Sequence, residues 1–377
     1  MRLRLQTILM IPLLAAACVE QYLPPVTDVN VDYLVVDGFL NGSAGTASII
    51  LTRAIPLGVN VVNPPEENAT VNIENVNGST FALPETKEGI YEAKDLDLDE
   101  TTAYRLRIHT NDGSSYTSDY IKLRKSPALD SVSWKPEAGG TRFYVSGHDA
   151  ANQTKYYRYL FTETWEYRVT FPSDWKKVDG QPVFRNQVTE QVYTCWRSAL
   201  STEILTASTK KLSTDVVSML PINFIKKGSR MLSRTYSLNV QQRAISQEEF
   251  EYWELIRKTT ENLGGLFDPL PSQVIGNVHN DDDAAEQVLG YFTGGFVQEK
   301  RIFVKLLDLP NELQIVDPYD FLCEKYFVPI AQPELAGADV FVESVGIPPI
   351  GYNVAIPNCA DCRSLGGDTI KPDYWPQ

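Results

Sequence analysis

The sequence is poor in histidine and lacks the common catalytic motifs. Its 377 residues contain three histidines, His109, His148 and His279, which lie in three separate segments. No HExxH, GxSxG or P-loop pattern is present, which argues against a zinc protease, a serine-hydrolase elbow and a nucleotide-binding loop. We therefore expect no enzyme activity, no cofactor and no metal ion.

Basic residues are in the minority. The chain has 34 Lys and Arg against 48 Asp and Glu, which gives a formal net charge of -14. Nucleic acids and anionic lipid headgroups attract clustered positive charge. The balance therefore argues against a nucleic-acid partner and against adsorption of the folded body to an anionic lipid surface. An acidic surface also keeps a protein soluble, so the charge identifies no partner.

Long hydrophobic runs are absent except at the N-terminus. There, two arginines and an apolar stretch over residues 5–14 precede Ala15–Ala17 and Cys18, which is the layout of a secretory signal. The stretch is interrupted by Pro12 and is shorter than the roughly 20 apolar residues that cross a bilayer. The junction predicts a signal peptide over residues 1–17 and transfer of a diacylglycerol and a palmitate-type acyl chain to Cys18. The alternative is an ordinary signal peptide with an incidental cysteine.

The residues after the cleavage site predict a tether and a location. Residues 18–29 contain two prolines and little periodicity, so they predict a flexible tether. Buried acyl chains contribute about 0.8 kcal/mol per CH₂, so two or three chains hold a large domain on a membrane. We expect lipid anchoring to the outer membrane with the body facing the cell surface, because Glu20 follows the cysteine closely. A periplasmic orientation is the alternative.

Four further cysteines are present, Cys195, Cys323, Cys359 and Cys362. An even number in an exported protein predicts two disulfides, and three pairings are possible. The close pair at 359 and 362 could also be redox-active or form half of a metal site. However, it follows an irregular proline-rich segment rather than a βαβ unit, and a Cys₄ zinc site needs a second close pair. Structural disulfides are the favoured interpretation.

Short alternating segments separated by Gly, Asn and Asp turns predict a mainly β fold. Residues 33–40 and 47–53 flank an Asn-Gly turn and indicate a hairpin, and residues 104–109 alternate cleanly. This spacing predicts an immunoglobulin-like β-sandwich over residues 30–125. Residues 126–377 predict a second β-rich, sandwich-like domain with one prominent helix insertion and a disulfide-stabilised C-terminal segment.

One helix is expected near residues 247–263. Ser246 and Glu249 form a capping box at its start, and a glycine pair after it supplies a C-terminal stop. Five residues recur on one face at helical spacing: Phe250, Trp253, Ile256, Thr260 and Leu263. This stripe predicts a helix packed on a sheet, and the lining of a ligand groove is the alternative.

Tryptophans are candidates for a ligand or partner platform. The four that we single out are Trp165, Trp175, Trp196 and Trp253, with Tyr167 and Trp375 as further aromatic candidates. Large rings dominate the energetics of interfaces, but the same residues also fill ordinary sandwich cores. The sequence leaves both interpretations open.

The densest carboxylate group is Asn280–Asp283 with Glu286. Hard oxygen ligands at short spacing suit Ca²⁺, but this segment lacks the glycine and the twelve-residue spacing of an EF-hand loop. A solvated acidic loop is the favoured interpretation.

The order of motifs along the chain resembles a known family. Nine segments carry the resemblance: the Cys18 junction, Tyr33–Gly38, Tyr236–Val240, Gly264–Pro269, Gly276–Val278, Val288–Phe292, Lys300–Val304, Cys359–Gly367 and Lys371–Trp375. Together they resemble the Bacteroidota lipoproteins grouped as domain of unknown function 4249, over essentially the whole mature chain. Val278 and Tyr374 stand where Ile and Phe are usual, and both keep the chemistry.

The resemblance implies a position on the outer membrane beside a TonB-dependent transporter of the SusC type, with no assigned catalytic residues. We therefore expect a non-enzymatic accessory lipoprotein that docks on such a β-barrel and aids substrate capture or gating. The alternatives are a surface hydrolase with an Asp/Glu site and an adhesin or envelope-assembly component. A cleft that holds two carboxylates in opposed environments would favour the hydrolase. The sequence does not identify the cargo.

Overall fold

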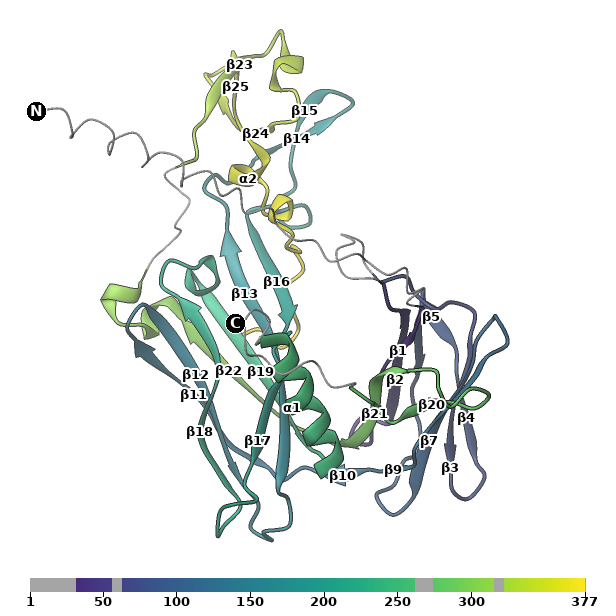
Figure 1. Cartoon of the computed structure of the whole chain (residues 1–377). Helices are drawn as coiled ribbons and strands as arrows, with labels where there is room; N and C mark the ends of the chain where they lie inside the picture. The colour runs from purple at the N-terminus through teal and green to yellow at the C-terminus, as the bar shows by residue number, and fades with distance from the viewer. Residues whose placement is uncertain (1–31, 56–62, 262–273, 315–321, 377) are drawn as a thin grey trace, which may run out of the picture.

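The computed structural model describes residues 32–55, 63–261, 274–314 and 322–376. Strands dominate these residues and form two β-bodies, with a smaller module projecting from the second body (Figure 1). The mainly β fold expected from the sequence is confirmed. The predicted signal peptide, Cys18 and the tether lie outside the described residues. No helix of the described ranges is both long and apolar enough to cross a membrane.

The N-terminal body is a sandwich of two sheets, as expected. One sheet has the order β10 (Arg124–Lys125), β21 (Leu289–Phe296), β1 (Leu34–Asn41), β2 (Thr46–Arg53), β6 (Ile90–Ala93) and β5 (Glu85–Lys87). The other has the order β20 (Val278–Asn280), β8 (Ser115–Ser118), β7 (Ala103–His109), β3 (Thr70–Asn75) and β4 (Thr80–Leu83), with β9 (Ile121–Lys122) also paired to β7. Alternate side chains point into the core, as Leu34, Val36 and Leu40 of β1 do.

Two strands of this sandwich come from late in the chain. β21 pairs in parallel with β1, which places Gly38 beside Phe292, and β20 pairs with β8. The expected division at residue 125 therefore needs one correction, because residues 278–296 pair within the N-terminal body. A parallel pair between distant segments has no connecting hairpin turn, so no local sequence signal marks it.

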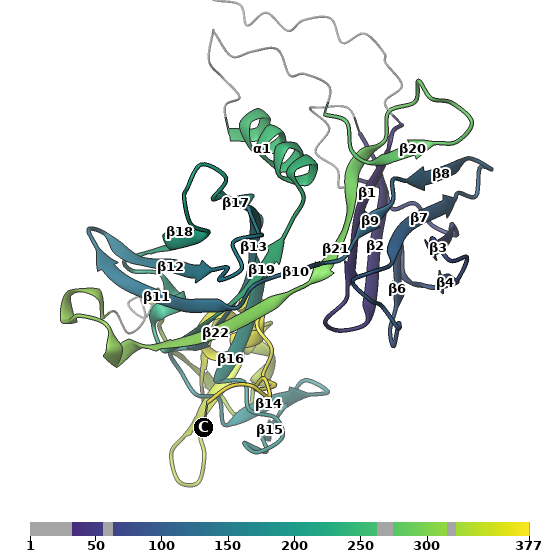
Figure 2. The same cartoon turned by 90° about the horizontal axis from the view of Figure 1, so that it is seen from below.

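The second body also has two sheets (Figure 2). One has the order β11 (Leu129–Glu137), β12 (Gly140–His148) and β18 (Val216–Lys226). The other has the order β16 (Thr194–Leu200), β13 (Tyr156–Arg168), β19 (Thr235–Ala244) and β22 (Gln298–Lys305), with β17 (Leu205–Ser208) also paired to β13. Short 3₁₀ turns are η2 (Arg230–Leu232), η3 (Leu306–Asp308) and η4 (Asn311–Leu313). Phe143, Tyr159 and Tyr236 are fully buried between the sheets, so the expected second sandwich is confirmed.

The expected helix is α1 (Gln247–Glu261), which contacts β13 and β17. Ser246 Oγ accepts a hydrogen bond from the N–H of Glu249 at 3.1 Å, which confirms the N-terminal cap. The most buried side chains of α1 are Glu249 and Tyr252, whereas the described part of the expected apolar stripe is only partly buried. The rest of the stripe and the glycine pair, residues 260–265, lie outside the described side chains.

The C-terminal module is a small three-stranded sheet. Its order is β23 (Tyr326–Pro329), β25 (Gly351–Ala355) and β24 (Val340–Val345), and the hairpin of β14 (Trp175–Val178) and β15 (Gln181–Phe184) lies against it (Figure 1). The short helices η6 (Pro333–Ala336), α2 (Pro357–Ala360) and η7 (Cys362–Leu365) complete it. Trp175 packs edge-on against Tyr352, with 5.0 Å between the ring centroids. A hairpin from the middle of the chain thus becomes part of a C-terminal unit.

Two disulfides fasten the C-terminal segment. Cys195 of β16 bonds Cys362 of η7, and Cys323 bonds Cys359 of α2. The two disulfides expected from the sequence are therefore confirmed, and the structure selects one of the three pairings. Each cysteine of the close pair bonds a distant partner, so the pair is not a redox couple closed on itself.

Candidate functional site

Two of the four candidate tryptophans lie on neighbouring strands but not on one surface. Trp165 of β13 lies opposite Arg197 of β16, and Glu166 lies opposite Trp196. Successive residues of a strand point to opposite faces, so Trp165 and Trp196 face opposite sides of the sheet. The structure therefore does not bring these two rings together into one platform.

The other aromatic candidates are also dispersed. Trp253 lies on α1, where the guanidinium carbon of Arg158 is 3.5 Å from the ring centroid. Tyr167 and Trp375 are buried. Trp175 alone among the four singled-out tryptophans lines the cleft described next.

Neither the histidines nor the acidic loop forms a metal centre in the described part of the chain. The histidines contact separate partners, His109 with Ser115, His148 with Asp130 and His279 with Asp119. In the acidic loop, Asn280 Oδ1 accepts hydrogen bonds from the N–H groups of Asp282 and Asp283 at 2.7 and 2.9 Å. Among the described residues, no group of three or more His, Cys, Asp and Glu is arranged to hold a metal ion.

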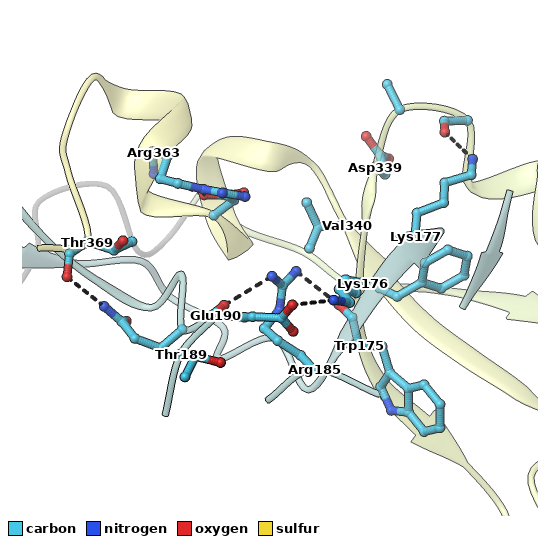
Figure 3. Close-up of a pocket in the computed structure, with 15 residues that line it drawn as sticks. Trp175, Lys176, Lys177, Arg185, Thr189, Glu190, Asp339, Val340, Arg363 and Thr369 are labelled. Atoms are coloured by element: carbon cyan, nitrogen blue, oxygen red, sulfur yellow. Dashed lines mark hydrogen bonds and ion pairs between the residues drawn. The ribbon is translucent and has the colours of Figure 1, made fainter. Parts of the chain in front are cut away.

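The candidate site is a cleft of about 510 Å³ between the β14–β15 hairpin, the following loop, the start of β24 and the C-terminal turn η7 (Figure 3). Charged side chains dominate its lining: Lys176, Lys177, Arg185, Glu190, Asp339, Asp361 and Arg363. Clefts of this size hold small molecules. We refer to it below as the module cleft.

Arg185 is the buried charge of the module cleft, with only 6% of its surface exposed. Its Nη1 donates to the main-chain oxygen of Glu190 at 3.1 Å and its Nη2 to that of Trp175 at 3.2 Å. Its Nε has no hydrogen-bond partner. Burial, together with the nearby cation Arg363, lowers the pKa of Arg185. The guanidinium is thus held by carbonyl dipoles rather than by a carboxylate.

Two of the three carboxylates of the module cleft, Glu190 and Asp361, form ion pairs. Lys176 Nζ contacts Glu190, and this hydrogen bond is the main cause that lowers the pKa of Glu190. Burial alone would raise the pKa of Asp361, but hydrogen bonds from Arg363, including Nη2 to Oδ2 at 2.6 Å, outweigh it and lower the pKa. Both carboxylates are therefore stabilised in the ionised form.

The walls of the module cleft are braced by contacts between distant segments. Asp361 lies between the disulfide-bonded Cys359 and Cys362, and Lys177 Nζ reaches the main-chain oxygen of Gly337 at 2.7 Å. Ser173 Oγ donates to the main-chain oxygen of Phe341 at 2.8 Å. These disulfides and hydrogen bonds hold the walls of the cleft in place before a ligand binds.

Sequence reasoning missed the basic residues of this site. Lys176 and Arg185 belong to no motif, and the Cys359–Gly367 segment that contains Arg363 suggested no binding role for it. The three come together only because β14–β15 folds onto the C-terminal sheet. The one usable signal was Asp361, a carboxylate between two cysteines that each bond a distant partner.

A second cleft, of about 390 Å³, lies between the two bodies beside the start of α1. Glu249 and Glu248 both line it. Glu249 is 4% exposed, and its carboxylate accepts hydrogen bonds from Thr293 Oγ1 at 2.6 Å and Trp253 Nε1 at 3.2 Å. Burial raises the pKa of Glu249. A hydrogen bond from its own N–H, followed by one from Ser246, lowers the pKa of Glu248.

Exposed apolar side chains gather on the C-terminal module. Ile347, at the turn between β24 and β25, is fully exposed (103%), and Ile350 is 61% exposed. Other exposed apolar side chains of the module are Leu322, Tyr326, Phe327, Ile330, Leu335 and Ile356. Residues 345–357 contain no charged side chain. Grouped apolar exposure of this kind is typical of interaction surfaces, and we call the Ile347–Ile350 turn the apolar tip.

Comparison with known proteins gives a family and two distant structural likenesses. Residues 19–301 match the family described as Domain of unknown function (DUF4249). No curated protein matches the chain. A two fibronectin type-III domain segment from chicken tenascin is 10% identical with a TM-score of 0.16, and the match covers 56% of this chain and 90% of that one.

A DUF4785 family protein from Legionella pneumophila is also 10% identical, with a TM-score of 0.18. The match covers 55% of this chain and 51% of that one, so the chain spans about half the length of that protein. The strand order described above, and not these alignments, defines the fold.

Proposed function

The chain belongs to the DUF4249 family, and on that premise we propose that it is a Bacteroidota outer-membrane lipoprotein that assists a TonB-dependent β-barrel of the SusC type. In this proposal Cys18 carries the lipid, the body faces the cell exterior, and the protein helps to capture or gate the cargo of the barrel without catalysing a reaction. The N-terminal leader and its Ala-Ala-Ala-Cys junction support the anchor.

The observation that carries the proposal is that one small module combines a cleft with an exposed apolar tip. The module cleft is wide enough for a small molecule, and both of its carboxylates with shifted pKa values are held ionised. Ionised carboxylates that are already paired suit binding better than proton donation. The apolar tip follows the opposite end of β24 from Val340 and Phe341, which line the cleft, and it supplies a surface for a protein partner.

The anchor is tested by intact-mass measurement of the mature protein. We expect a mass that corresponds to cleavage before Cys18 plus diacylglycerol and fatty-acyl increments. A mature chain without acyl groups, recovered from the medium, would remove the location on which the proposed role depends.

The partner is tested by gentle detergent extraction and co-purification of the tagged full-length protein. We expect a SusC-type β-barrel in the purified complex. The double substitution Ile347→Ser and Ile350→Ser should reduce barrel recovery at least fivefold, because it removes apolar contact area without creating a buried cavity. Ile275→Ser is the matched control, since Ile275 is 70% exposed but lies outside the module.

A monomer under gentle conditions, or equal barrel recovery with the tip variant and the control, would count against the docking role. Unchanged nutrient uptake in a deletion strain that has lost adhesion would instead favour an adhesin or envelope-assembly component.

A surface hydrolase is the second candidate function, and one observation favours it. In the cleft between the bodies, the pKa of Glu249 is raised while that of Glu248 is lowered, which is the opposition that an acid and a base require. However, Glu249 is almost completely buried and accepts two hydrogen bonds, so a substrate does not reach it in this conformation. Hydrolysis of a glycan or peptide by the wild type that is abolished in Glu249→Gln would establish the hydrolase.

A further inference from the structure

The module cleft has a small excess of positive charge in a strongly negative protein. Four of its lining side chains are Lys or Arg and three are Asp or Glu, whereas the whole chain has a formal net charge of -14. The local sign is therefore opposite to that of the molecule. Such a reversal attracts an anionic ligand to one place and disfavours its binding elsewhere.

The carboxylates of the cleft form their direct contacts with groups other than its buried cation. Glu190 pairs with Lys176 and Asp361 with Arg363, and Asp339 accepts a hydrogen bond from the hydroxyl of Tyr326 at 2.8 Å. None of the three forms an ion pair with Arg185. The carboxylates of Glu190 and Asp361 act on Arg185 electrostatically without contacting it. Together with the carbonyl dipoles they offset only part of the cost of burying a guanidinium, because the pKa of Arg185 is still lowered.

We propose that the module cleft binds an oxyanion of the cargo, a carboxylate or a sulfate group, whose charge is compensated by Arg185, Arg363 and Lys176. Guanidinium groups present a planar set of donors that fits such oxyanions. Figure 3 shows Arg185 within the cleft, with Lys176 close to Glu190 and Arg363 projecting from η7. This inference rests on the proposed function only in identifying the ligand as cargo.

The disulfides explain why the site keeps its shape. Arg363 follows Cys362, which is bonded to Cys195. Its guanidinium forms a bidentate ion pair with Asp361, through Nε at 2.9 Å and Nη2 at 2.6 Å. The cation at the rim is thereby held close to Arg185, and this proximity is itself unfavourable. An oxyanion between the two guanidinium groups removes that repulsion.

The test uses the mature full-length chain in mild detergent and isothermal titration calorimetry at constant ionic strength. The probes are glucuronate, inorganic sulfate and, as the neutral match to glucuronate, glucose. We expect saturable binding of glucuronate or sulfate and no binding of glucose. Binding of glucuronate alone would assign a carboxylate ligand, and binding of sulfate alone a sulfated one.

Four variants separate the site from general charge effects. Arg363→Gln and Lys176→Gln, both at partly exposed positions, should weaken binding about tenfold each, as expected for the loss of one charge-assisted contact. Lys87→Gln on β5, exposed and far from the cleft in sequence and fold, should bind as the wild type does. Arg185→Gln should abolish binding, and the two rim variants keep the test valid if it fails to fold.

A folded wild type that binds neither oxyanion, or rim variants that bind as tightly as Lys87→Gln, would overturn the proposal. The outcome is distinguishable from that of the proposed function. Recovery of a β-barrel without oxyanion binding would contradict only the ligand assignment. Oxyanion binding without recovery of a barrel would contradict only the docking role.

Discussion

At the scale of single residues, close approach of main chains decides how the N-terminal sandwich is completed. Gly290 has φ +95°, and a Cβ on it would lie 1.9 Å from the carbonyl oxygen of Val36. Gly113 has almost the same φ, +94°, but a Cβ there would meet nothing within 4 Å. The two glycines share a backbone conformation that would strain any other residue, and they differ in the space around the missing Cβ. Their comparison therefore isolates the effect of the contact between β21 and β1.

We predict that Gly290→Ala lowers the free energy of unfolding by at least about 3 kcal/mol, whereas Gly113→Ala lowers it by about 1 kcal/mol. The larger loss arises because the added methyl group pushes β21 away from β1. Urea unfolding followed by circular dichroism measures both values. Equal losses would show that β21 does not need this close contact with β1.

At the scale of elements, α1 is docked through a buried carboxylate, Glu249, and through Tyr252, which packs on Tyr291, rather than through the expected apolar stripe. Glu249 faces Thr293 of β21, and the guanidinium groups of Arg158 on β13 and Arg243 on β19 act on it electrostatically. Burial lowers the pKa of Arg243 to about 9, and its guanidinium carbon lies 3.4 Å from the ring centroid of Phe39 on β1. The helix therefore belongs to a charged cluster that also contacts the N-terminal body.

The raised pKa of Glu249 makes stability depend on pH. Because the folded state holds this proton more tightly than the unfolded state, whose ordinary value is 4.5, the free energy of unfolding should fall as pH rises from 4.5 through the raised pKa. Glu249→Gln should remove that decline. Glu248→Gln should keep the decline. The pKa of Glu248 is lowered, so Glu248 changes stability only at pH values below 4.5. Denaturant titrations at a series of pH values measure the slope, and identical slopes in the two variants would contradict the assignment.

Local elements were predictable from the sequence because their signals are local. The β1–β2 hairpin follows from alternation around an Asn-Gly turn, and the start of α1 follows from Ser246. The identity of the buried face of α1 was not predictable, since it depends on cations that β13 and β19 supply. The pairing of β21 with β1 and the assembly of the module cleft depend on contacts between segments far apart in the chain, which periodicity does not report.

At the scale of the whole molecule, the chain crosses between the two bodies more than once along nearly the same line. β21 of the first body ends at Phe296 and β22 of the second begins at Gln298, as Figure 2 shows. Beside this crossing, the N–H of Ser126 donates to the oxygen of Phe296 at 2.9 Å, and Ser126 Oγ accepts from the N–H of Ala244 at 2.8 Å. These hydrogen bonds tie the two crossing segments together, so bending between the two bodies has to break them.

The two disulfides secure that module to different extents, because they close loops of different length. Cys195–Cys362 spans 167 residues and Cys323–Cys359 spans 36. In the chain-entropy description the longer loop contributes about 1 kcal/mol more to the free energy of unfolding. We predict that the double variant with Cys195→Ser and Cys362→Ser unfolds at lower urea concentration than the one with Cys323→Ser and Cys359→Ser.

The same two disulfide variants also test how far each bridge preserves ligand binding in the module cleft. Loss of Cys195–Cys362 removes the covalent link between β16 and η7, which carries Arg363, and leaves the weaker hydrogen bond from Arg197 to the main-chain oxygen of Leu365. The first variant should therefore also bind the oxyanion probes more weakly. The second variant retains the bond from η7 to β16 and should keep more of that affinity. Equal stability and equal affinity in the two variants would contradict this ranking of the two bridges. If both variants also matched the wild type, the packing of Trp175 against Tyr352 would be the main support of the cleft.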